Sequence, residues 1–210
     1  MGKGYFVKTP SWLKKIYPSF VWDMEPKEKK LYLTFDDGPH PVITPFTLNL
    51  LKQFNAKATF FCIGENVQKY PDVYHKIIEE GHSTGNHTQH HLNGWATDDE
   101  DYLLDVAAAD VNIRSGLFRP PYGRIKRSQF RLLKKKHPGM KVIMWSILAG
   151  DWDESLKPER CFDRIIKNTS GGDIIVLHET EKAYARLAFV LPKTLNYFSE
   201  KGYKFKEISL

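Results

Sequence analysis

The segment LYLTFDDGP, residues 31–39, combines the pattern of a buried strand with an abrupt stop. Residues 31–35 are apolar, aromatic or β-branched, which is typical of a strand. The Gly-Pro pair that ends the segment predicts a turn, so the carboxylates of Asp36 and Asp37 come at the carboxyl end of the strand. Buried neighbouring carboxylates repel each other and lose hydration, so they need a cation or hydrogen-bond donors nearby. The alternative is that the pair caps a following helix.

Similar short runs recur along the chain and alternate with helical patterns, which indicates repeated βα units around a parallel sheet. A length of 210 residues is compatible with one domain, and we find no linker or internal repeat. Seven strands and six helices are one βα unit short of an eightfold barrel, which favours a distorted or incomplete barrel over an open doubly wound sheet. The expected strands are residues 31–35, 58–63, 82–85, 117–119, 142–146, 174–177 and 204–208, and the expected helices are residues 44–54, 67–80, 98–113, 128–136, 158–168 and 183–200.

The composition excludes several classes of protein. Hydrophobic residues make up 41% and charged residues 27% of the chain, which is typical of a globular fold. No apolar run approaches the roughly 18 residues of a transmembrane segment. Lysines interrupt the first 20 residues where a signal peptide would be apolar, so we expect a cytoplasmic protein as the sequence stands, or an exported one if a leader was removed. Cys62 and Cys161 lack CxxC spacing and predict buried thiols.

The net charge of +6 raises the question of a nucleic-acid partner. Residues 124–141 hold eight Lys or Arg and no acidic residue, but the pattern fits the solvated face of an amphipathic helix, and we expect no nucleic-acid partner and a monomer as the default.

Residues 1–29 are expected to form an extension packed on a catalytic domain of residues 30–210. The extension carries four large aromatic residues. We favour the interpretation that they pack on the barrel; the alternative is that they lie on a membrane surface beside the lysines of the extension. These aromatic residues are Trp12, Tyr17, Phe20 and Trp22.

Four of the eight histidines fall within residues 82–91, at the end of the third expected strand. His87 and His91 have i, i+4 spacing and would share one face of a helical turn. Together with Asp37 they would form a two-histidine, one-carboxylate set that leaves positions open for water and substrate. We therefore assign Asp37, His87 and His91 as ligands of a divalent metal ion. The spacing alone is weak support, and His82 is expected to lie outside the ligand set.

Three later strand ends also carry polar groups. The sequence RPPYG, residues 119–123, predicts a rigid turn in which Arg119 could pair with Asp36 or Asp151. AGDW supplies Asp151 and Trp152, and IVLHE supplies His178. Taken singly, each of these segments also has a purely structural explanation.

The chain resembles the polysaccharide deacetylases, also called carbohydrate esterase family 4 or the chitooligosaccharide deacetylase homology domain. The resemblance lies in the order and spacing of five motifs: TFDDGP, HTQHH, RPPYG, AGDW and IVLHE. The similarity extends over about residues 30–208. It implies a distorted (β/α)7 barrel. It also implies a hydrolase that removes N-acetyl groups from a peptidoglycan- or chitin-like amino-sugar polymer or oligomer and releases acetate. One divalent metal ion is implied, with Zn2+ favoured over Co2+, Ni2+ and Mn2+.

The resemblance also implies a role for each site residue. Asp36 would be the general base and His178 the general acid. Asp37, His87 and His91 would bind the metal ion, and Thr88 would form a hydrogen bond near the two histidines. Arg119 would orient Asp36 and would itself be held by Asp151. The backbone N–H of Tyr122 would bind the oxyanion, and Trp152 and Leu177 would shape the pocket for the acetyl group.

The sequence departs from the family pattern at three positions. Ser146 and Leu148 stand where family members often carry acidic residues, and Glu179 stands where Asp is usual. The first two departures are expected to weaken the support of Arg119 or His178, and the Glu179 departure is expected to be minor.

Two alternative functions remain open: an O-acetyl esterase acting on xylan or small esters, and a carbohydrate-binding barrel without turnover. A glycosidase that uses Asp36 and Asp37 is disfavoured, because its two carboxyl groups would have to face each other across a bond.

Overall fold

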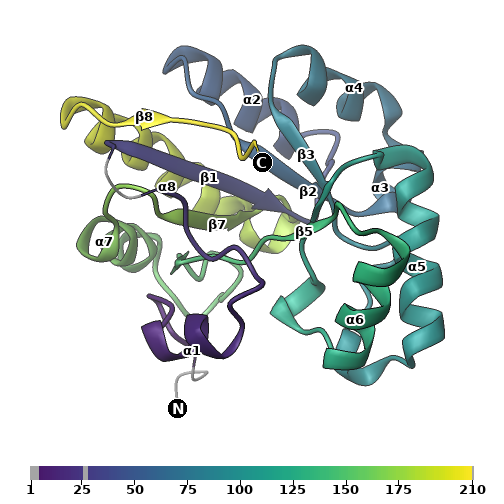
Figure 1. Cartoon of the computed structure of the whole chain (residues 1–210). Coiled ribbons are helices and arrows are strands. Elements are labelled where there is room, and N and C mark those ends of the chain that lie inside the picture. Colours follow the sequence, from purple (N-terminus) through teal and green to yellow (C-terminus); the bar gives the residue numbers. More distant parts are fainter. Residues whose placement is uncertain (1–4, 26–27, 210) are drawn as a thin grey trace.

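A curled parallel sheet forms the centre of the protein (Figure 1). The computed structural model describes residues 5–25 and 28–209, so residues 1–4 and 26–27 of the expected extension and residue 210 lie outside the described chain. The strands are β1 (Lys30–Asp36), β2 (Thr59–Cys62), β3 (Ser83–Asn86), β4 (Leu117–Phe118), β5 (Lys141–Val142), β6 (Ile147–Leu148), β7 (Ile174–His178) and β8 (Lys204–Phe205). Their order is β5-β4-β3-β2-β1-β7-β6, and β8 pairs with β1 beside this path.

Helices surround the sheet and follow most of its strands. They are α1 (Ser11–Ile16), α2 (Ile43–Gln53), α3 (Gly64–Lys69), α4 (Pro71–Glu79), α5 (Asp99–Ile113), α6 (Arg127–Lys136), α7 (Pro158–Asn168) and α8 (Glu181–Glu200), with short 3-10 helices η1 (Gly94–Ala96) and η2 (Pro121–Gly123). The single helix expected over residues 67–80 is wrong. Pro71 starts a new helix there, because its ring fixes φ and it has no N–H to donate to the preceding turn.

The strand expected over residues 142–146 is wrong beyond Val142, because β5 ends there and the next strand, β6, begins only at Ile147. These two short strands occupy opposite ends of the sheet path although only four residues separate them in the chain. The sheet must therefore curl until its ends approach each other. This is the distorted (β/α)7 barrel that the sequence predicts.

The N-terminal segment, residues 5–25, lies across the opening between β5 and β6. Leu148 donates a backbone hydrogen bond to Val7 (2.8 Å), and Met144 donates one to Val21 (2.7 Å). The segment also reaches the helices on both sides of this opening. The Tyr5 hydroxyl accepts a hydrogen bond from Arg164 of α7 (2.7 Å), whereas the ring of Phe20 packs against Phe130 of α6.

Strand alternation divides the buried residues into two sets. Leu33 and Phe35 of β1 belong, with Leu177 of β7, to the large core between sheet and helices. The intervening side chains, Thr34 and Asp36, face the inside of the barrel, where Arg119 contacts both of them. Cys62 and Cys161 are buried free thiols, as predicted. None of the described helices combines the length and hydropathy that crossing a bilayer requires.

His82 gives the fold a pH-dependent stability that can be measured. Its side chain is buried, and Nδ1 accepts a hydrogen bond from the Ala58 N–H, which requires an unprotonated nitrogen. Burial, aided by Lys57, lowers the pKa of His82 to about 4. The unfolded chain binds the proton more readily, so stability is complete above pH ~6.5 and falls as the pH decreases towards 4, by roughly 3 kcal/mol. Urea unfolding at several pH values should show this loss.

The variant His82→Asn keeps an acceptor near the Nδ1 position and does not titrate. It should unfold with a visibly flatter pH dependence between pH 7 and 4. Parallel curves for the two proteins would exclude His82 as the titrating group.

Candidate active site

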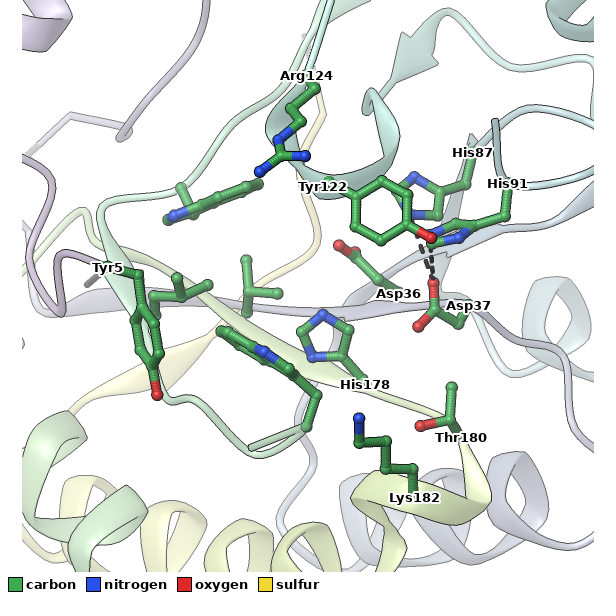
Figure 2. A pocket seen from close by; sticks show the side chains of 14 residues that line it. Tyr5, Asp36, Asp37, His87, His91, Tyr122, Arg124, His178, Thr180 and Lys182 are labelled. Carbon is green, nitrogen blue, oxygen red and sulfur yellow. Dashed lines mark ion pairs between the residues drawn. The ribbon is translucent and has the colours of Figure 1, made fainter. Parts of the chain in front are cut away.

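A cavity of about 550 Å³ opens at the carboxyl ends of β1, β3 and β7 (Figure 2). In parallel barrels the loops that follow the strands converge at this end. Of the predicted site residues, Asp36, Asp37, His87, His91, Tyr122, Trp152 and His178 line the cavity.

Asp37 turns out of line with Asp36, so both carboxylates reach the cavity. Successive side chains of a strand point to opposite faces, but the φ of Asp37 is 73°, in the left-handed region, and this interrupts the alternation. Asn66 fixes the turn by donating its side-chain amide to the Asp37 carbonyl (2.8 Å).

The carboxylate of Asp37 faces two imidazoles. Its Oδ1 lies 3.1 Å from Nε2 of His91 and 3.5 Å from Nε2 of His87. Burial raises the pKa of Asp37, but hydrogen bonds from the two imidazoles in their protonated form and the charge of His178 lower it by more, so the pKa lies well below its usual range. The group is therefore a carboxylate at neutral pH.

The hydrogen bonding of His87 shows which ring nitrogen can act as a ligand. His87 Nδ1 lies 2.7 Å from the Arg119 carbonyl oxygen, which can only accept, so Nδ1 carries the proton. In the neutral imidazole, Nε2 then presents a lone pair to the Asp37 oxygen. That Oδ1 atom is buried and accepts no hydrogen bond from the described residues. Lone pairs that face one another in a buried site require a cation between them.

Asp37, His87 and His91 could therefore hold a metal ion. One ligand atom from each residue lies within 4.8 Å of the others. For comparison, two atoms bound at about 2.1 Å to a tetrahedral zinc ion lie about 3.4 Å apart. The donor set of two nitrogens and one oxygen is also suited to such an ion.

The expected helical turn over residues 87–91 is wrong, because this segment is an irregular loop after β3. Thr88 and His91 have positive φ values of 64° and 55°. Thr88 stabilises the loop through two hydrogen bonds: its N–H donates to Asn86 Oδ1, and its hydroxyl accepts from the Leu92 N–H. The histidines thus converge through a strained loop, and not through helical periodicity.

Asp36 is paired with a fully buried arginine. Arg119 Nη1 donates to Asp36 Oδ1 at 2.7 Å and to the Thr34 hydroxyl at 2.7 Å. The remaining guanidinium nitrogens donate to the Ile143 and Met144 carbonyls. Arg119 also stacks over the ring of Phe61, at 4.0 Å from its centroid. The guanidinium charge therefore compensates Asp36 without a bound ion.

Asp151 holds His178, which corrects the expectation that it holds Arg119. Its Oδ1 lies 2.9 Å from His178 Nδ1, and its Oδ2 accepts the His178 backbone N–H at 2.7 Å. Strand order explains the difference. Asp151 follows β6, which pairs with β7 and so ends beside His178, whereas Arg119 follows β4 on the other side of the sheet.

The carboxylates around His178 favour its protonated form. Burial lowers its pKa, but the carboxylates of Asp151, Asp37 and Asp36 outweigh this and raise the pKa to about 9. Since Nδ1 donates to Asp151, Nε2 is the ring nitrogen that can exchange a proton with a substrate. His178 is also the register partner of Asp36 across β1 and β7, so an acid and a carboxylate lie side by side in the cavity.

Tyr122 borders the cavity opposite His178 (Figure 2). Its φ is 59°, and its ring lies 4.6 Å from that of His91. The two prolines before it restrict the chain and help to maintain this uncommon conformation. Its role in oxyanion binding remains a prediction.

The apolar part of the cavity is formed by Trp152, Val176 and Leu148. The ring of Trp152 packs edge-on against His178 at 4.8 Å. The expectation that Leu177 lines the cavity is wrong: Leu177 is fully buried in the core beneath the helices. Because strand residues alternate, Val176 and His178 face the cavity and Leu177 faces away.

Sequence reasoning missed several residues of the cavity wall. Tyr5, Arg124, Trp145, Thr180 and Lys182 all line it. Thr180 and Lys182 follow His178 closely in the chain, so their position could have been inferred. Tyr5 has no such signal, because its place depends on how the N-terminal segment crosses the barrel.

The three departures from the family pattern are accommodated locally. Ser146 accepts a hydrogen bond from the Ile174 N–H (3.0 Å), and Leu148 contributes apolar cavity wall. Glu179 is buried and accepts a hydrogen bond from the Thr44 hydroxyl (2.7 Å). Burial raises the pKa of Glu179 to about 7, although that hydrogen bond opposes the shift.

Known proteins are similar to this chain in sequence and in fold. A model of the polysaccharide deacetylase family matches residues 23–140. A peptidoglycan-N-acetylglucosamine deacetylase of Bacillus cereus is 34% identical over 196 residues, which cover 90% of this chain and 91% of that protein. A chitooligosaccharide deacetylase of Azorhizobium caulinodans is 33% identical over 159 residues, covering 72% of this chain and 74% of that protein.

A solved structure agrees closely with the fold. The crystal structure of the Bc1960 peptidoglycan N-acetylglucosamine deacetylase superposes with a TM-score of 0.86 at 27% identity, covering 95% of each chain. The extent of these matches shows that the chain belongs to the polysaccharide deacetylase family.

Proposed function

We propose that this protein is a metal-dependent deacetylase that hydrolyses N-acetyl groups of a peptidoglycan- or chitin-like amino-sugar polymer or oligomer and releases acetate. One observation carries the proposal: Asp37 faces the Nε2 atoms of His87 and His91, while the neighbouring Asp36 is compensated by Arg119. The relatives include a peptidoglycan deacetylase and a chitooligosaccharide deacetylase, and both support this substrate class.

Asp37, His87 and His91 would hold the metal ion, with Zn2+ as the favoured metal because imidazole and carboxylate ligands suit it. Such an ion polarises an acyl oxygen and lowers the pKa of a bound water towards neutrality. Asp36 accepts the proton of the attacking water. Its ion pair with Arg119 fixes its orientation and keeps it out of the ligand set.

His178 donates a proton to the departing sugar nitrogen. Amines are poor leaving groups, so this proton is essential for amide hydrolysis. Asp151 fixes the ring and keeps it protonated at neutral pH, because its negative charge stabilises the imidazolium. In our proposal, the Tyr122 N–H stabilises charge on the tetrahedral oxygen. Trp152, Val176 and Leu148 accommodate the acetyl methyl group.

Metal dependence can be tested by measuring acetate release. The Zn2+-loaded protein should release acetate from N-acetylated chitooligosaccharides or peptidoglycan fragments, lose that activity after treatment with a chelator, and regain it when Zn2+ is restored. Asp36→Asn removes the base and the charged partner of Arg119 but no metal ligand, so it should keep its metal content, measured by mass spectrometry, while kcat falls about 10²–10⁴-fold. Acetate release that resists the chelator would exclude the metal from the reaction.

Amide and ester substrates should differ in how strongly their hydrolysis depends on His178. His178→Ala should lower acetate release from N-acetylated sugars about 10²–10⁴-fold, because the amine then leaves without a proton. Hydrolysis of 4-nitrophenyl acetate should fall far less, since its leaving group needs no acid. His75→Ala, an exposed histidine on α4, is the matched control and should leave both rates unchanged. Equal losses on the two substrates would contradict the assignment, and a wild-type preference for acetylated xylan would favour the esterase alternative.

A further inference from the structure

Positive charge is concentrated in two segments of the chain. Residues 5–22 and 124–141 together contain eleven Lys or Arg and no Asp or Glu. All remaining residues hold 20 basic and 25 acidic side chains, a net charge of −5. The positive net charge of the protein therefore comes entirely from these two segments, which are far apart in the sequence.

The fold brings the two segments together. The first contains α1 and the second contains α6, and both helices lie at the lower side of the molecule in Figure 1. The ring of Phe20 packs edge-on against that of Phe130, with 4.9 Å between the centroids. The guanidinium of Arg127 lies 6.0 Å from the ring centroid of Tyr17. The exposed side chains of both segments thus form one surface, which we call the basic face.

The cations of α6 are aligned, and most cations of the basic face are unpaired. Arg127, Arg131 and Lys135 are exposed and share one side of the helix, because each is four residues from the next. Like charges at this spacing repel each other. Nine of the eleven cations form no ion pair with a described residue; the exceptions are Lys8 with Asp173 and Lys14 with Asp23. An anionic partner would relieve this repulsion.

A hollow of about 470 Å³ lies between the two segments. Residues 16–20 form one of its walls, and Lys126, Arg127 and Arg131 contribute to the other. Guanidinium groups suit phosphate in particular, because two of their N–H groups can donate to two phosphate oxygens at once. The hollow therefore offers a place for a phosphate-bearing group within the basic face.

The helix α1 presents apolar side chains next to these cations. Leu13 and Tyr17 pack against the protein, whereas Trp12 and Ile16 lie on the other side of the helix and are 53% and 48% exposed. Phe6 is 58% exposed, and its ring contacts that of Trp12 edge-on, with 6.3 Å between the centroids. Contiguous exposed apolar side chains are typical of an interaction surface. Packing within the protein therefore does not account for Trp12.

We propose that the basic face binds the surface of an anionic phospholipid bilayer. Phe6, Trp12 and Ile16 enter the headgroup region, and the cations of α6 lie against lipid phosphates. Aromatic and aliphatic side chains beside Lys and Arg are typical of segments that lie on a membrane, and anionic lipids attract the cations. A second copy of the chain would bring two cationic surfaces together, and a nucleic acid would use the cations but not Ile16. This inference does not depend on the proposed function.

Cosedimentation of the whole protein with vesicles tests the electrostatic part of the proposal. The protein should bind vesicles of equal parts phosphatidylglycerol and phosphatidylcholine, and should not bind phosphatidylcholine alone. Arg127→Gln/Arg131→Gln should weaken binding at least about tenfold, since each cation at an anionic surface strengthens binding about fivefold. Lys52→Gln/Lys206→Gln is the matched control, because it removes the same charge from exposed positions outside the basic face. This control should bind like the wild type.

The variant Trp12→Ala/Ile16→Ala tests the apolar part. It should bind the same vesicles about tenfold more weakly, because it loses apolar surface that the bilayer would bury. Its melting temperature should not change, since both side chains are exposed. Ile78→Ala/Leu104→Ala is the matched control, because these residues are similarly exposed on α4 and α5. Its vesicle binding should equal that of the wild type.

Vesicle binding requires neither a metal ion nor turnover, so a failure to release acetate would not affect this inference. Absence of wild-type binding to the anionic vesicles at low salt would overturn it. Equal binding by the wild type and both variants of the basic face would overturn it as well. If the wild type bound duplex DNA as tightly as the vesicles, and Trp12→Ala/Ile16→Ala left vesicle binding unchanged, the face would be a general polyanion surface and the proposal would be wrong.

Discussion

The ion pair between Arg119 and Asp36 gives two adjacent aspartates different roles. Arg119 is fully buried and donates to Thr34, Asp36 and two backbone carbonyls, so its charge is compensated only if Asp36 remains ionised beside it. Asp37, by contrast, faces two imidazole nitrogens and forms no ion pair with an arginine or lysine of the described chain. One carboxylate is thus neutralised by the fold, and the other is left for an exchangeable ion. A base and a ligand can therefore occupy consecutive positions of one strand end.

Much of the fold could be predicted because the composition of short segments determines where many strands and helices form. Runs such as residues 31–35 have a strand composition, and Pro158 and the acidic first turn of α5 mark helix starts. Features that depend on partners could not be predicted. Residues 142–146 have the composition of one strand, but only Val142 lies in a strand: β5 ends there after pairing with β4, and β6, which begins at Ile147, pairs with β7. The spacing of His87 and His91 suggested a helix because a sequence pattern does not reveal positive φ values in a loop.

The same limit applies to the site. Strand ends carry or closely precede the main site residues, and in a parallel barrel that position predicts convergence at one end; these residues are Asp36, Asp37, His87, His91 and His178. The partner of Asp151 depends on strand order, and the face of Leu177 depends on register, so both expectations were wrong in detail. Tyr5 could not be found at all, because it comes from a segment that crosses the barrel opening far from every motif. That segment bridges the opening of the curled sheet through backbone hydrogen bonds of Val7 and Val21.

The division of roles between Asp36 and Asp37 is tested most directly by anomalous diffraction at the zinc edge from a crystal grown with Zn2+. Our account predicts one strong anomalous peak within coordination distance of Asp37 Oδ1 and of Nε2 of both His87 and His91, with Asp36 outside the coordination sphere and still paired with Arg119. An ion bound to Asp36, or a peak located away from the three ligands, would contradict it.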